Sequence, residues 1–414
     1  MNRVLILLGL SIFVNYIDRA NLSVAAPLVR AELGLSATQL GVLLSAFFWT
    51  YACMQPVAGW LVDRFDVKWV FAIGFFVWSV ATAVTGGVHA FALFLLMRVI
   101  LGVGESIAYP SYSKIFATFL AENQRGAANA IIGTGQALGP GLGMFFGGMM
   151  IAGFGWRIFF IGLGTMSLFW LIPWLRWVPR ASNTHVGGVV TTPPITEIAR
   201  QKSAWGAWIG HFCAVYALYF LLTWLPSYLE EERHFSPHRM AQIAGAVFLT
   251  MAASSLICGY LCDAWIARGA SPTLARKTFL GTGLICTGVF LTLCVLASPA
   301  VSIVCLLLTG ASLGTNSNIN AIGQTLAGST AAGRWMGLQN CVGNLAGWVA
   351  PALTGILVGR TGHYSWAFLI TAAVVWVGVL DWVFIVGRVE PIAWENRQEG
   401  FPRLAAAEDR CNSY

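Results

Sequence analysis

The sequence has little charge, since only 10% of its 414 residues are charged while 57% are hydrophobic. A soluble globular domain carries charge on about a quarter of its residues. So few charges could not cover the surface of a single soluble core, and the apolar content excludes a disordered chain. A polytopic membrane protein remains. Its net charge of +7 then indicates basic loops at the membrane surface rather than nucleic-acid binding.

Motifs of soluble catalysis are also absent from the sequence. It contains no Gly-Lys-Ser/Thr loop for phosphates, so transport or chemistry driven by ATP is not expected. The nine Cys form no Cys-x-x-Cys pair, and no His, Cys and acidic residues have the spacing of metal ligands, so we expect neither a metal nor another cofactor. Gly102-x-Gly104 and Gly133-x-Gly135 lie inside apolar segments and indicate helix packing rather than nucleotide binding. His211 is interpreted as a packing residue.

Twelve apolar segments are each long enough to cross a bilayer as a helix. The expected spans are 4–29, 36–62, 68–87, 90–117, 124–151, 155–178, 204–229, 239–265, 277–297, 299–327, 334–358 and 363–387. The first is not interpreted as a cleaved signal peptide, because Asp18, Arg19 and Asn21 follow its apolar start without a convincing cleavage site. The expected fold is an all-α membrane protein.

Basic residues predict the orientation and the division of the chain. Lys and Arg in the connections concentrate on the side of the N-terminus, so both termini are expected in the cytoplasm. Gly59-Trp-Leu-Val-Asp63 ends the second span and Gly259-Tyr-Leu-Cys-Asp263 ends the eighth. This repeat predicts two six-helix bundles with a site between them, as in many secondary transporters. The predicted parts are a first bundle (1–178), a cytoplasmic linker (179–203), a second bundle (204–388) and a cytoplasmic tail (389–414).

Five charged residues are expected inside these spans, where each costs roughly 2.5–3.5 kcal/mol. Asp18 and Arg19 lie near the middle of the first span. Arg98 and Glu105 lie seven residues apart in the fourth, on one helix face and about 10 Å from each other. A charge inside a span is a candidate functional group. Asp381 is alone near the end of the last span and is expected to reach the membrane interface.

Asp18 and Glu105 are the candidate proton carriers. A carboxyl group buried beside a guanidinium can take up and release a proton, and Arg98 is the expected charge partner. The alternative is a structural ion pair in which the acids only neutralise Arg98. Arg19 could instead bind an anionic substrate, because its planar fork matches a carboxylate.

Polar residues in other spans predict a polar central cavity, although amides and hydroxyls can also simply join helices. They occur in spans of both halves, and Tyr216, Tyr219 and Thr223 form a stripe on the seventh. The candidate residues for contact with a substrate are Tyr51, Gln136, Ser317, Asn320, Asn340 and Asn344.

Several segments resemble motifs of known transporters. Residues 59–64, Gly-Trp-Leu-Val-Asp-Arg, resemble the loop motif that follows the second helix in the major facilitator superfamily, although 66–68 depart from it. Residues 15–23, Asn-Tyr-Ile-Asp-Arg-Ala-Asn-Leu-Ser, closely resemble the first-helix signature of the anion:cation symporter family within that superfamily. Segments 45–56, 98–110 and 339–347 resemble its second, fourth and eleventh helices.

The resemblance implies proton-coupled symport of a small organic anion, a sugar acid or another carboxylate, by alternating access. Positions matching Asp18 and Glu105 are linked to proton coupling in that family, and Asn320 stands where its sugar-acid members often have Trp. The matching positions that line the substrate site are Tyr16, Arg19, Tyr51, Gln136, Ser317 and Asn340. The motif at Gly59, Asp63 and Arg64 is expected to be a conformational loop.

The expected partners are the anion, protons and the lipid bilayer, with no nucleic acid and a monomeric state. The expected location is the cell membrane, as a multi-pass protein, which is the inner membrane in a Gram-negative bacterium.

A proton-coupled exporter of the same fold is the nearest alternative, because Gly139-Pro140-Gly141 resembles a motif of drug/proton antiporters. A membrane-embedded enzyme would need a catalytic cluster that is not visible, and a nutrient sensor would need a longer tail. The anion, the number of protons, sodium coupling and the direction of transport are left open.

Overall fold

The computed structural model describes residues 2–119, 122–179 and 193–394, which form helices joined by turns. The first half contains α1 (Asn2–Leu33), α2 (Ala37–Arg64), α3 (Val67–Thr85), α4 (Phe91–Ser106), α5 (Ala108–Phe119), α6 (Glu122–Leu142), the π-helical turn η1 (Gly143–Gly147), α7 (Gly148–Phe154), α8 (Trp156–Phe169) and α9 (Leu171–Trp177). The second half contains α10 (Ile195–Arg200), α11 (Lys202–Ser227), the π-helical turn η2 (Tyr228–Glu232), α12 (Pro237–Ala267), α13 (Pro272–Leu296), α14 (Pro299–Leu313), the 3-10 turn η3 (Gly314–Asn316), α15 (Ser317–Thr361) and α16 (Ser365–Phe384).

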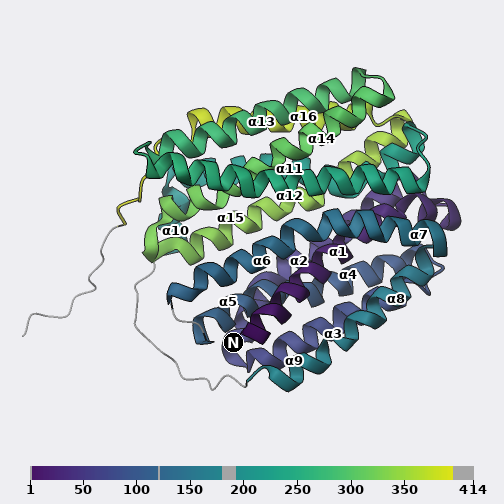
Figure 1. Cartoon of the computed structure of the whole chain (residues 1–414), viewed down its shortest axis with the longest axis horizontal. Helices are drawn as coiled ribbons and strands as arrows, with labels where there is room; N and C mark the ends of the chain where they lie inside the picture. The colour runs from purple at the N-terminus through teal and green to yellow at the C-terminus, as the bar shows by residue number, and fades with distance from the viewer. Residues whose placement is uncertain (1, 120–121, 180–192, 395–414) are drawn as a thin grey trace, which may run out of the picture.

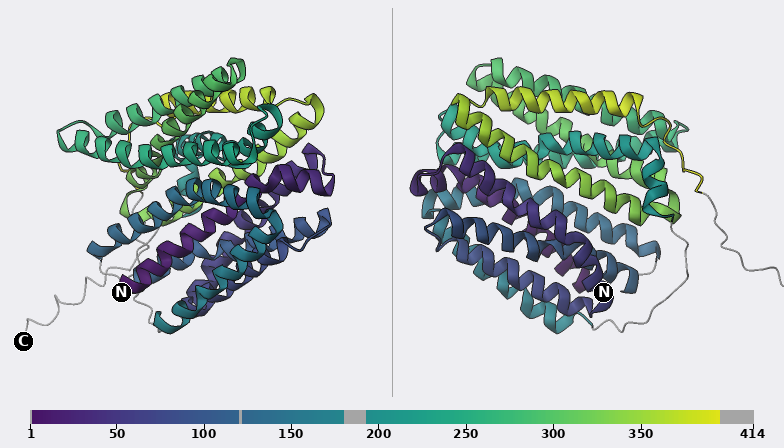
Figure 2. Two further views of the ribbon diagram at one scale, coloured as in Figure 1. Left: turned by 45° about the vertical axis from the view of Figure 1, so that its right-hand side comes forward. Right: turned by 180° about the vertical axis from the view of Figure 1, so that it is seen from behind.

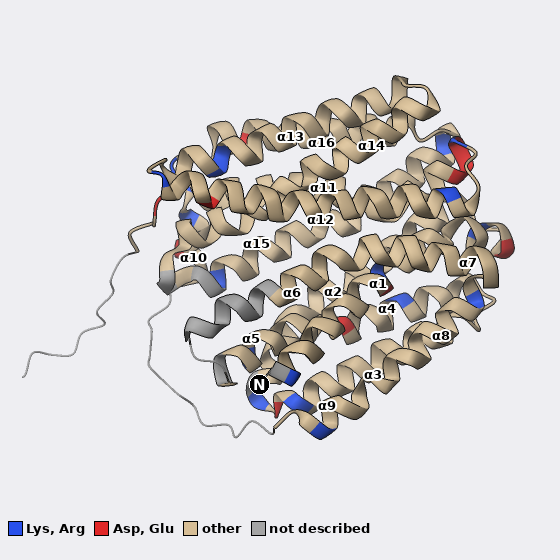
Figure 3. Cartoon of the chain, viewed as in Figure 1, with Lys and Arg blue, Asp and Glu red and all other residues tan. Residues whose placement is uncertain are grey.

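These helices gather into two bundles, with α1–α9 on one side and α11–α16 on the other (Figures 1 and 2). Within the described residues, 12 helical stretches are long and apolar enough to cross a membrane. The expectation of twelve spans is therefore confirmed. The expected and observed ranges differ most for the fifth span, which was expected over 124–151. Its apolar stretch runs over Ile131–Phe154, because the first turns of α6 are polar. Charged residues gather at the ends of the helices, and only a few lie in the interior (Figure 3).

Helix ends follow local sequence signals. Ser36 accepts a hydrogen bond from the backbone of Gln39, whose side chain bonds back to Ser36, and this capping box begins α2. Ser236 and Ser271 cap α12 and α13, each followed directly by a proline. Gly362 ends α15 in the left-handed conformation with φ 74°, which glycine adopts without steric cost. These signals fix where the spans end.

A break in α15 separates the tenth span from the eleventh. Gly328 there has φ 63° and ψ −179°, a conformation essentially restricted to glycine. The carbonyls of Leu326 and Ala327 accept hydrogen bonds from the backbone N–H of Ile392 at 3.0 Å and the indole N–H of Trp394 at 2.8 Å. The start of the expected tail therefore packs on this break, while 395–414 lie outside the described residues, as do 180–192 of the expected linker.

The two bundles approach each other closely where α2 meets α15. A Cβ added at Gly41 would lie 2.7 Å from the carbonyl oxygen of Pro351 and 2.9 Å from the Cα of Gly355. At the same end of the molecule, Arg30 of α1 forms an ion pair with Glu231 of η2. Small residues allow such backbone approach in membranes. One end of the interface between the bundles is thus closed by backbone contact and by an ion pair.

We predict that Gly41→Ala lowers the melting temperature of the purified protein, because its methyl group would force two backbones apart at a cost of about 1–3 kcal/mol. Gly281→Ala in α13 is the matched control, since a Cβ there meets nothing within 4 Å. That control is expected to melt at the wild-type temperature or slightly higher, as alanine favours helix by up to about 1 kcal/mol. Equal melting of the Gly41 variant and the control would contradict the close contact.

Candidate functional site

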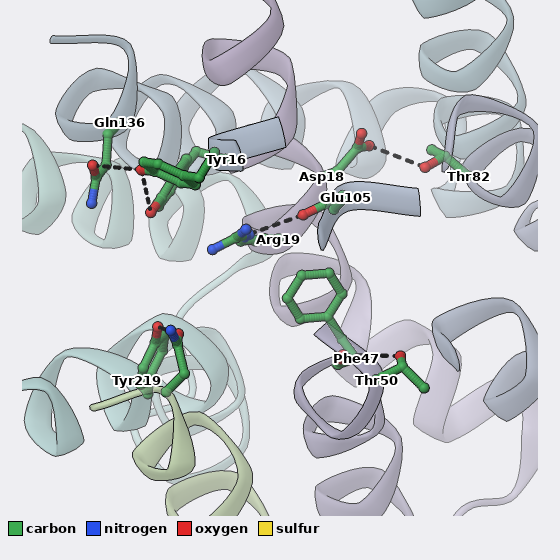
Figure 4. Close-up of polar contacts among 11 residues, drawn as sticks. Tyr16, Asp18, Arg19, Phe47, Thr50, Thr82, Glu105, Gln136 and Tyr219 are labelled. Carbon is green, nitrogen blue, oxygen red and sulfur yellow. Dashed lines mark hydrogen bonds and ion pairs between the residues drawn. The ribbon is translucent and has the colours of Figure 1, made fainter. Parts of the chain in front are cut away.

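A buried ion pair joins α1 to α4. The Nε of Arg19 donates to the Oε2 of Glu105 at 3.0 Å, with side-chain exposures of 3% and 0% (Figure 4). Arg98 interacts electrostatically with Glu105 and Asp18, but its Nε has no hydrogen-bond partner among the described residues. The direct partner of Glu105 is therefore Arg19, whereas the sequence analysis expected Arg98.

Asp18 lies beside this pair on the face of α1 toward α3. Its Oδ1 accepts a hydrogen bond from Thr82 at 3.3 Å, and the residue is 2% exposed. Two cations and two acids thus occupy the interior of the first bundle, which keeps their total charge balanced. Burying an unbalanced charge would cost several kcal/mol.

Aromatic rings enclose the guanidinium of Arg19. Its Cζ lies 4.6 Å from the ring centre of Tyr16, 5.0 Å from that of Phe47 and 4.4 Å from that of Tyr51. Such contacts stabilise a buried cation. The Nη2 of Arg19 is buried without a hydrogen-bond partner in the described structure. This unpartnered nitrogen is a donor suited to an anion.

Close packing of α2 on α4 places Phe47 and Tyr51 at the cation. The side chain of Thr50 donates to the carbonyl of Val99 at 2.8 Å. It also bonds to the carbonyl of Phe47 one turn earlier in α2 (Figure 4). A Cβ at Gly102 would collide with the Phe47 carbonyl and the Thr50 hydroxyl. Glycine at this position therefore lets α2 approach closely enough for its rings to reach Arg19.

A chain of hydroxyl and amide groups extends the site toward α6. The hydroxyl of Tyr109 donates to the Oε1 of Gln136 at 2.8 Å and lies 3.4 Å from the hydroxyl of Tyr16. Gln136 is exposed, so solvent reaches this end of the site. Sequence reasoning missed Tyr109, although its place one turn after Glu105, where α4 gives way to α5, was an available signal.

The second bundle contributes uncharged groups. The hydroxyl of Tyr219 in α11 donates to the Oδ1 of Asn344 in α15 at 2.8 Å, and the Nδ2 of Asn344 donates to the Asn340 carbonyl at 2.8 Å. Tyr219 packs edge-on against Phe48 with ring centres 4.7 Å apart, and Figure 4 shows it on the second bundle, across from Arg19 of the first. The structure thus brings Tyr219, noted in the sequence only as part of a stripe, to the site.

Other expected residues lie apart from these contacts. Ser317 donates to the Gly314 carbonyl within its own turn at 3.2 Å, and both Ser317 and Asn320 are exposed. Gly59 and Arg64 are at the far end of α2, where Arg64 lies 5.9 Å from the Trp60 ring; the side chain of Asp63 is outside the described residues.

Two titratable residues of the second bundle also lie outside the contacts of the site. His211 packs against Gly343 with its Nδ1 3.2 Å from the Gln339 carbonyl. Asp381 was expected at the membrane interface, but it is 3% exposed and packs against Gly210. No group of three or more His, Cys, Asp or Glu that could hold a metal occurs among the residues with described positions.

Comparisons with known proteins agree with this architecture. The family model of the Major Facilitator Superfamily matches residues 8–347. A probable sulfoacetate transporter of Cupriavidus necator is 33% identical, covering 90% of this chain and 91% of that protein. The hexuronate transporter of Bacillus subtilis is 29% identical over 94% of both chains. The ascorbate transporter of Arabidopsis thaliana chloroplasts is also 29% identical, covering 88% of this chain and 71% of that protein.

A solved structure shares the fold. A bacterial homologue of the human lysosomal transporter Spinster, in an inward-facing and occupied conformation, has a TM-score of 0.78 at 17% identity, covering 92% of this chain and 95% of that chain. The expected arrangement of twelve helices in two bundles is therefore confirmed, and the family expected from the sequence motifs is confirmed at the level of the superfamily.

We predict that Arg19→Gln destabilises the protein by about 3–5 kcal/mol at neutral pH, because it leaves the carboxylate of Glu105 buried without its partner. Acid protonates that carboxyl group and removes the buried charge, so the loss of melting temperature is expected to shrink at pH 5. The double variant Arg19→Gln/Glu105→Gln is expected to recover most of the loss at pH 8.

The matched control is Glu32→Gln, which breaks the more exposed pair of Arg157 and Glu32, with side-chain exposures of 23% and 45%, and leaves the bonds of Arg157 to the carbonyls of Gly86 and Val88 in place. Exposed pairs contribute at most about 1 kcal/mol. Thermal unfolding of the purified variants at pH 5 and pH 8 measures the loss of melting temperature in the Arg19 variant and in the control. A pH-independent loss for Arg19→Gln, or no recovery in the double variant, would contradict the buried pair.

Proposed function

The chain belongs to the major facilitator superfamily of transporters, and we propose that it carries a small organic anion, a sugar acid or another carboxylate, together with a proton. It is a transporter rather than an enzyme, as are the named relatives. The observation that carries the proposal is the buried guanidinium of Arg19, whose Nε donates to Glu105 while its Nη2 has no hydrogen-bond partner among the described residues. The cell membrane is the proposed location.

The unpartnered Nη2 of Arg19 is the proposed anchor for the substrate carboxylate. Carboxylates are strong hydrogen-bond partners of a guanidinium, and the rings of Tyr16 and Tyr51 lie 4.6 and 4.4 Å from the Cζ of Arg19. The relatives named for sulfoacetate and hexuronate support an anionic substrate. The proposed substrate-binding residues are Tyr16, Arg19, Tyr51, Gln136, Ser317, Asn320, Asn340 and Asn344.

Competition for Arg19 is the proposed basis of coupling. While Glu105 is ionised it binds the Nε of Arg19 at 3.0 Å and neutralises the guanidinium, so the Nη2 attracts a substrate anion only weakly. A proton on Glu105 neutralises the carboxylate and frees the guanidinium for the substrate anion. Proton and anion therefore enter the site together, and the balance of buried charge is kept. Asp18, held by Thr82, is the second proposed proton site, with Arg98 as its charge partner.

Alternating access is the proposed cycle, in which the two bundles rock about the site. The contact of Gly41 with Gly355 and the ion pair of Arg30 with Glu231 hold one end of the interface closed. Both must separate when that end opens. The sequence resemblance predicted a conformational loop at Gly59, Asp63 and Arg64, but these residues lie in the last turns of α2. This end of α2 is proposed to act at the opposite end of the molecule, on the side proposed to be cytoplasmic.

We predict that Glu105→Gln abolishes uptake driven by an imposed proton gradient in proteoliposomes but retains exchange of labelled for unlabelled anion. The amide is neutral at every pH, so it frees Arg19 without carrying a proton. Glu32→Gln, which removes an acid at the protein surface, is expected to leave gradient-driven uptake intact. If the Glu105 variant still accumulates the anion in proportion to the proton gradient, Glu105 is not the proton carrier. Coupled export in the same vesicles would instead favour the antiporter alternative.

We predict that Glu231→Gln shifts the conformational equilibrium about two- to fivefold toward opening of the closed end, as expected for loss of a partly exposed ion pair. The side chains of Arg30 and Glu231 are 28% and 26% exposed. Hydrogen exchange measured by mass spectrometry should rise in peptides from the α1–α2 turn and the end of α15, and fall at the opposite end of the molecule.

Glu32→Gln is again the matched control, since it breaks an ion pair at the same end but within one bundle. Its exchange should change only near Glu32 and Arg157. The double reversal Arg30→Glu/Glu231→Arg should restore the wild-type pattern. A Glu231 variant whose exchange differs from the wild type only around residue 231 would show that the pair does not hold the bundles together.

A further inference from the structure

We propose that residues 389–394, which follow the last span, form a strap that fixes the eleventh span against the tenth, with Trp394 as its positioning residue. The strap concerns the structure of the second bundle and is independent of what the protein carries. Its consequence for the amides of Asn340 and Asn344 rests on the proposed function, because that function makes both of them substrate-binding residues.

The strap supplies hydrogen-bond donors to the end of the tenth span. Gly328 interrupts α15, and the last carbonyls of a helix need donors from outside that helix. The backbone N–H of Ile392 donates to the carbonyl of Leu326 at 3.0 Å. The indole N–H of Trp394 donates to the carbonyl of Ala327 at 2.8 Å. Leu326 and Ala327 are both buried, so loss of the strap would remove a donor from each of two buried carbonyls, which is costly.

The strap is also anchored where it begins. The backbone N–H of Val389, a buried residue, donates to the Oγ1 of Thr273 in the first turn of α13 at 2.9 Å. The side chains of Ile392 and Trp394 pack against buried apolar residues. The strap therefore runs from the start of α13 to the break in α15, and its hydrogen bonds join two elements of the second bundle.

The indole of Trp394 packs against the first turn of the eleventh span. Its ring centre lies 6.4 Å from that of the buried Trp335. The indole N–H of Trp335 donates to the Oε1 of Gln339 at 2.9 Å. Gln339 is buried as well, and a Cβ added at Gly323 in the tenth span would lie 2.4 Å from its Oε1. Trp394 thus supports Trp335, which orients the side chain that packs the eleventh span on the tenth.

Gln339 directly precedes the amides of the proposed site. The carbonyl of the next residue, Asn340, accepts from the Nδ2 of Asn344 at 2.8 Å. The Oδ1 of Asn344 accepts from the hydroxyl of Tyr219 at 2.8 Å. These three amide residues belong to one helix, so a rotation of the eleventh span moves Asn340 and Asn344 together. Contacts in a row do not by themselves establish coupling, so the strap and the site need separate measurements.

The first test is hydrogen exchange measured by mass spectrometry on the full chain in lipid nanodiscs. Trp394→Ala removes the donor to Ala327 and the ring that packs on Trp335. Exchange in peptides covering 326–344 is then expected to rise about five- to tenfold, as for the loss of a buried hydrogen bond. Peptides from the α1–α2 turn and from 351–361 are expected to exchange as in the wild type, because other contacts hold the closed end of the interface.

Trp366→Ala is the matched control, because it removes a 56% exposed indole from the same bundle, and it is expected to leave exchange over 326–344 unchanged. A chain ending at Trp394 keeps every contact of the strap and is expected to exchange as the wild type. Wild-type exchange over 326–344 in Trp394→Ala would overturn the strap. Trp394→Phe keeps a ring but cannot donate, so its increase is expected over 326–331, and it replaces the alanine variant if that protein does not purify as a single species.

The second test measures the consequence at the proposed site. It follows exchange of labelled for unlabelled D-glucuronate, D-gluconate, sulfoacetate and L-ascorbate in proteoliposomes. Trp394→Ala is expected to raise the half-saturating concentration of a transported anion at least about threefold, while the maximal rate stays within about twofold. Amides that are held less firmly bind more weakly, whereas Arg19 and Glu105 are unchanged. A fall in the maximal rate alone would overturn the positioning role.

A double variant separates positioning from a general loss of structure. If Trp394 acts through Asn340, Trp394→Ala adds less than about twofold to the half-saturating concentration in an Asn340→Ala background. An equal increase in both backgrounds would overturn the positioning of Asn340 and leave the strap standing. Exchange of none of the four anions by the wild-type protein would overturn the proposed function and with it this consequence, whereas the hydrogen-exchange result still decides the strap.

Discussion

The ion pair of Arg19 with Glu105 is the constraint on which the site depends, because both groups are nearly inaccessible to solvent and neither could be buried alone. A charge in the middle of a membrane span costs roughly 2.5–3.5 kcal/mol even on insertion scales. The pair offsets this cost only while both groups remain charged and aligned. Loss of charge on Glu105 therefore leaves Arg19 without its direct counter-ion, and in the proposed transport cycle the substrate anion takes that place.

Close packing of α2 on α4 surrounds the ion pair of Arg19 and Glu105 with aromatic rings. Glycine at position 102 lets α2 reach α4, and the approach carries Phe47 and Tyr51 to the guanidinium. Lipid tails offer no hydrophobic driving force between helices, so packing and hydrogen bonds between small and polar residues hold these spans together. The same rule applies between the bundles, where Gly41 lies against Gly355. Glycine in this sequence thus serves both the site and the interface that must open and close around it.

Much of the fold could be predicted from the sequence, because apolar length and the placement of charge are properties of single spans. The partner of Glu105 could not, since it depends on how α1 and α4 are rotated against each other. Tyr219 was visible only as one residue of a stripe, and its role follows from the packing of α11 on α15. The contact of Trp394 with the break at Gly328 was missed as well, because a short segment without regular structure after the last span carries no periodic signal.

The asymmetry between the bundles has a consequence for the proposed transport cycle. The buried charges described around the site, Asp18, Arg19, Arg98 and Glu105, belong to the first bundle, whereas the second meets them with Tyr219 and amides. The charged groups therefore move together as one body when the bundles rock, and their mutual distances need not change. An ionised Glu105 on Arg19, and a protonated Glu105 with a substrate anion on Arg19, carry the same total charge. The bundles can then exchange conformations in either state without moving an uncompensated charge through the membrane, whereas a site with the proton alone or the anion alone would be held back by the cost of burying it.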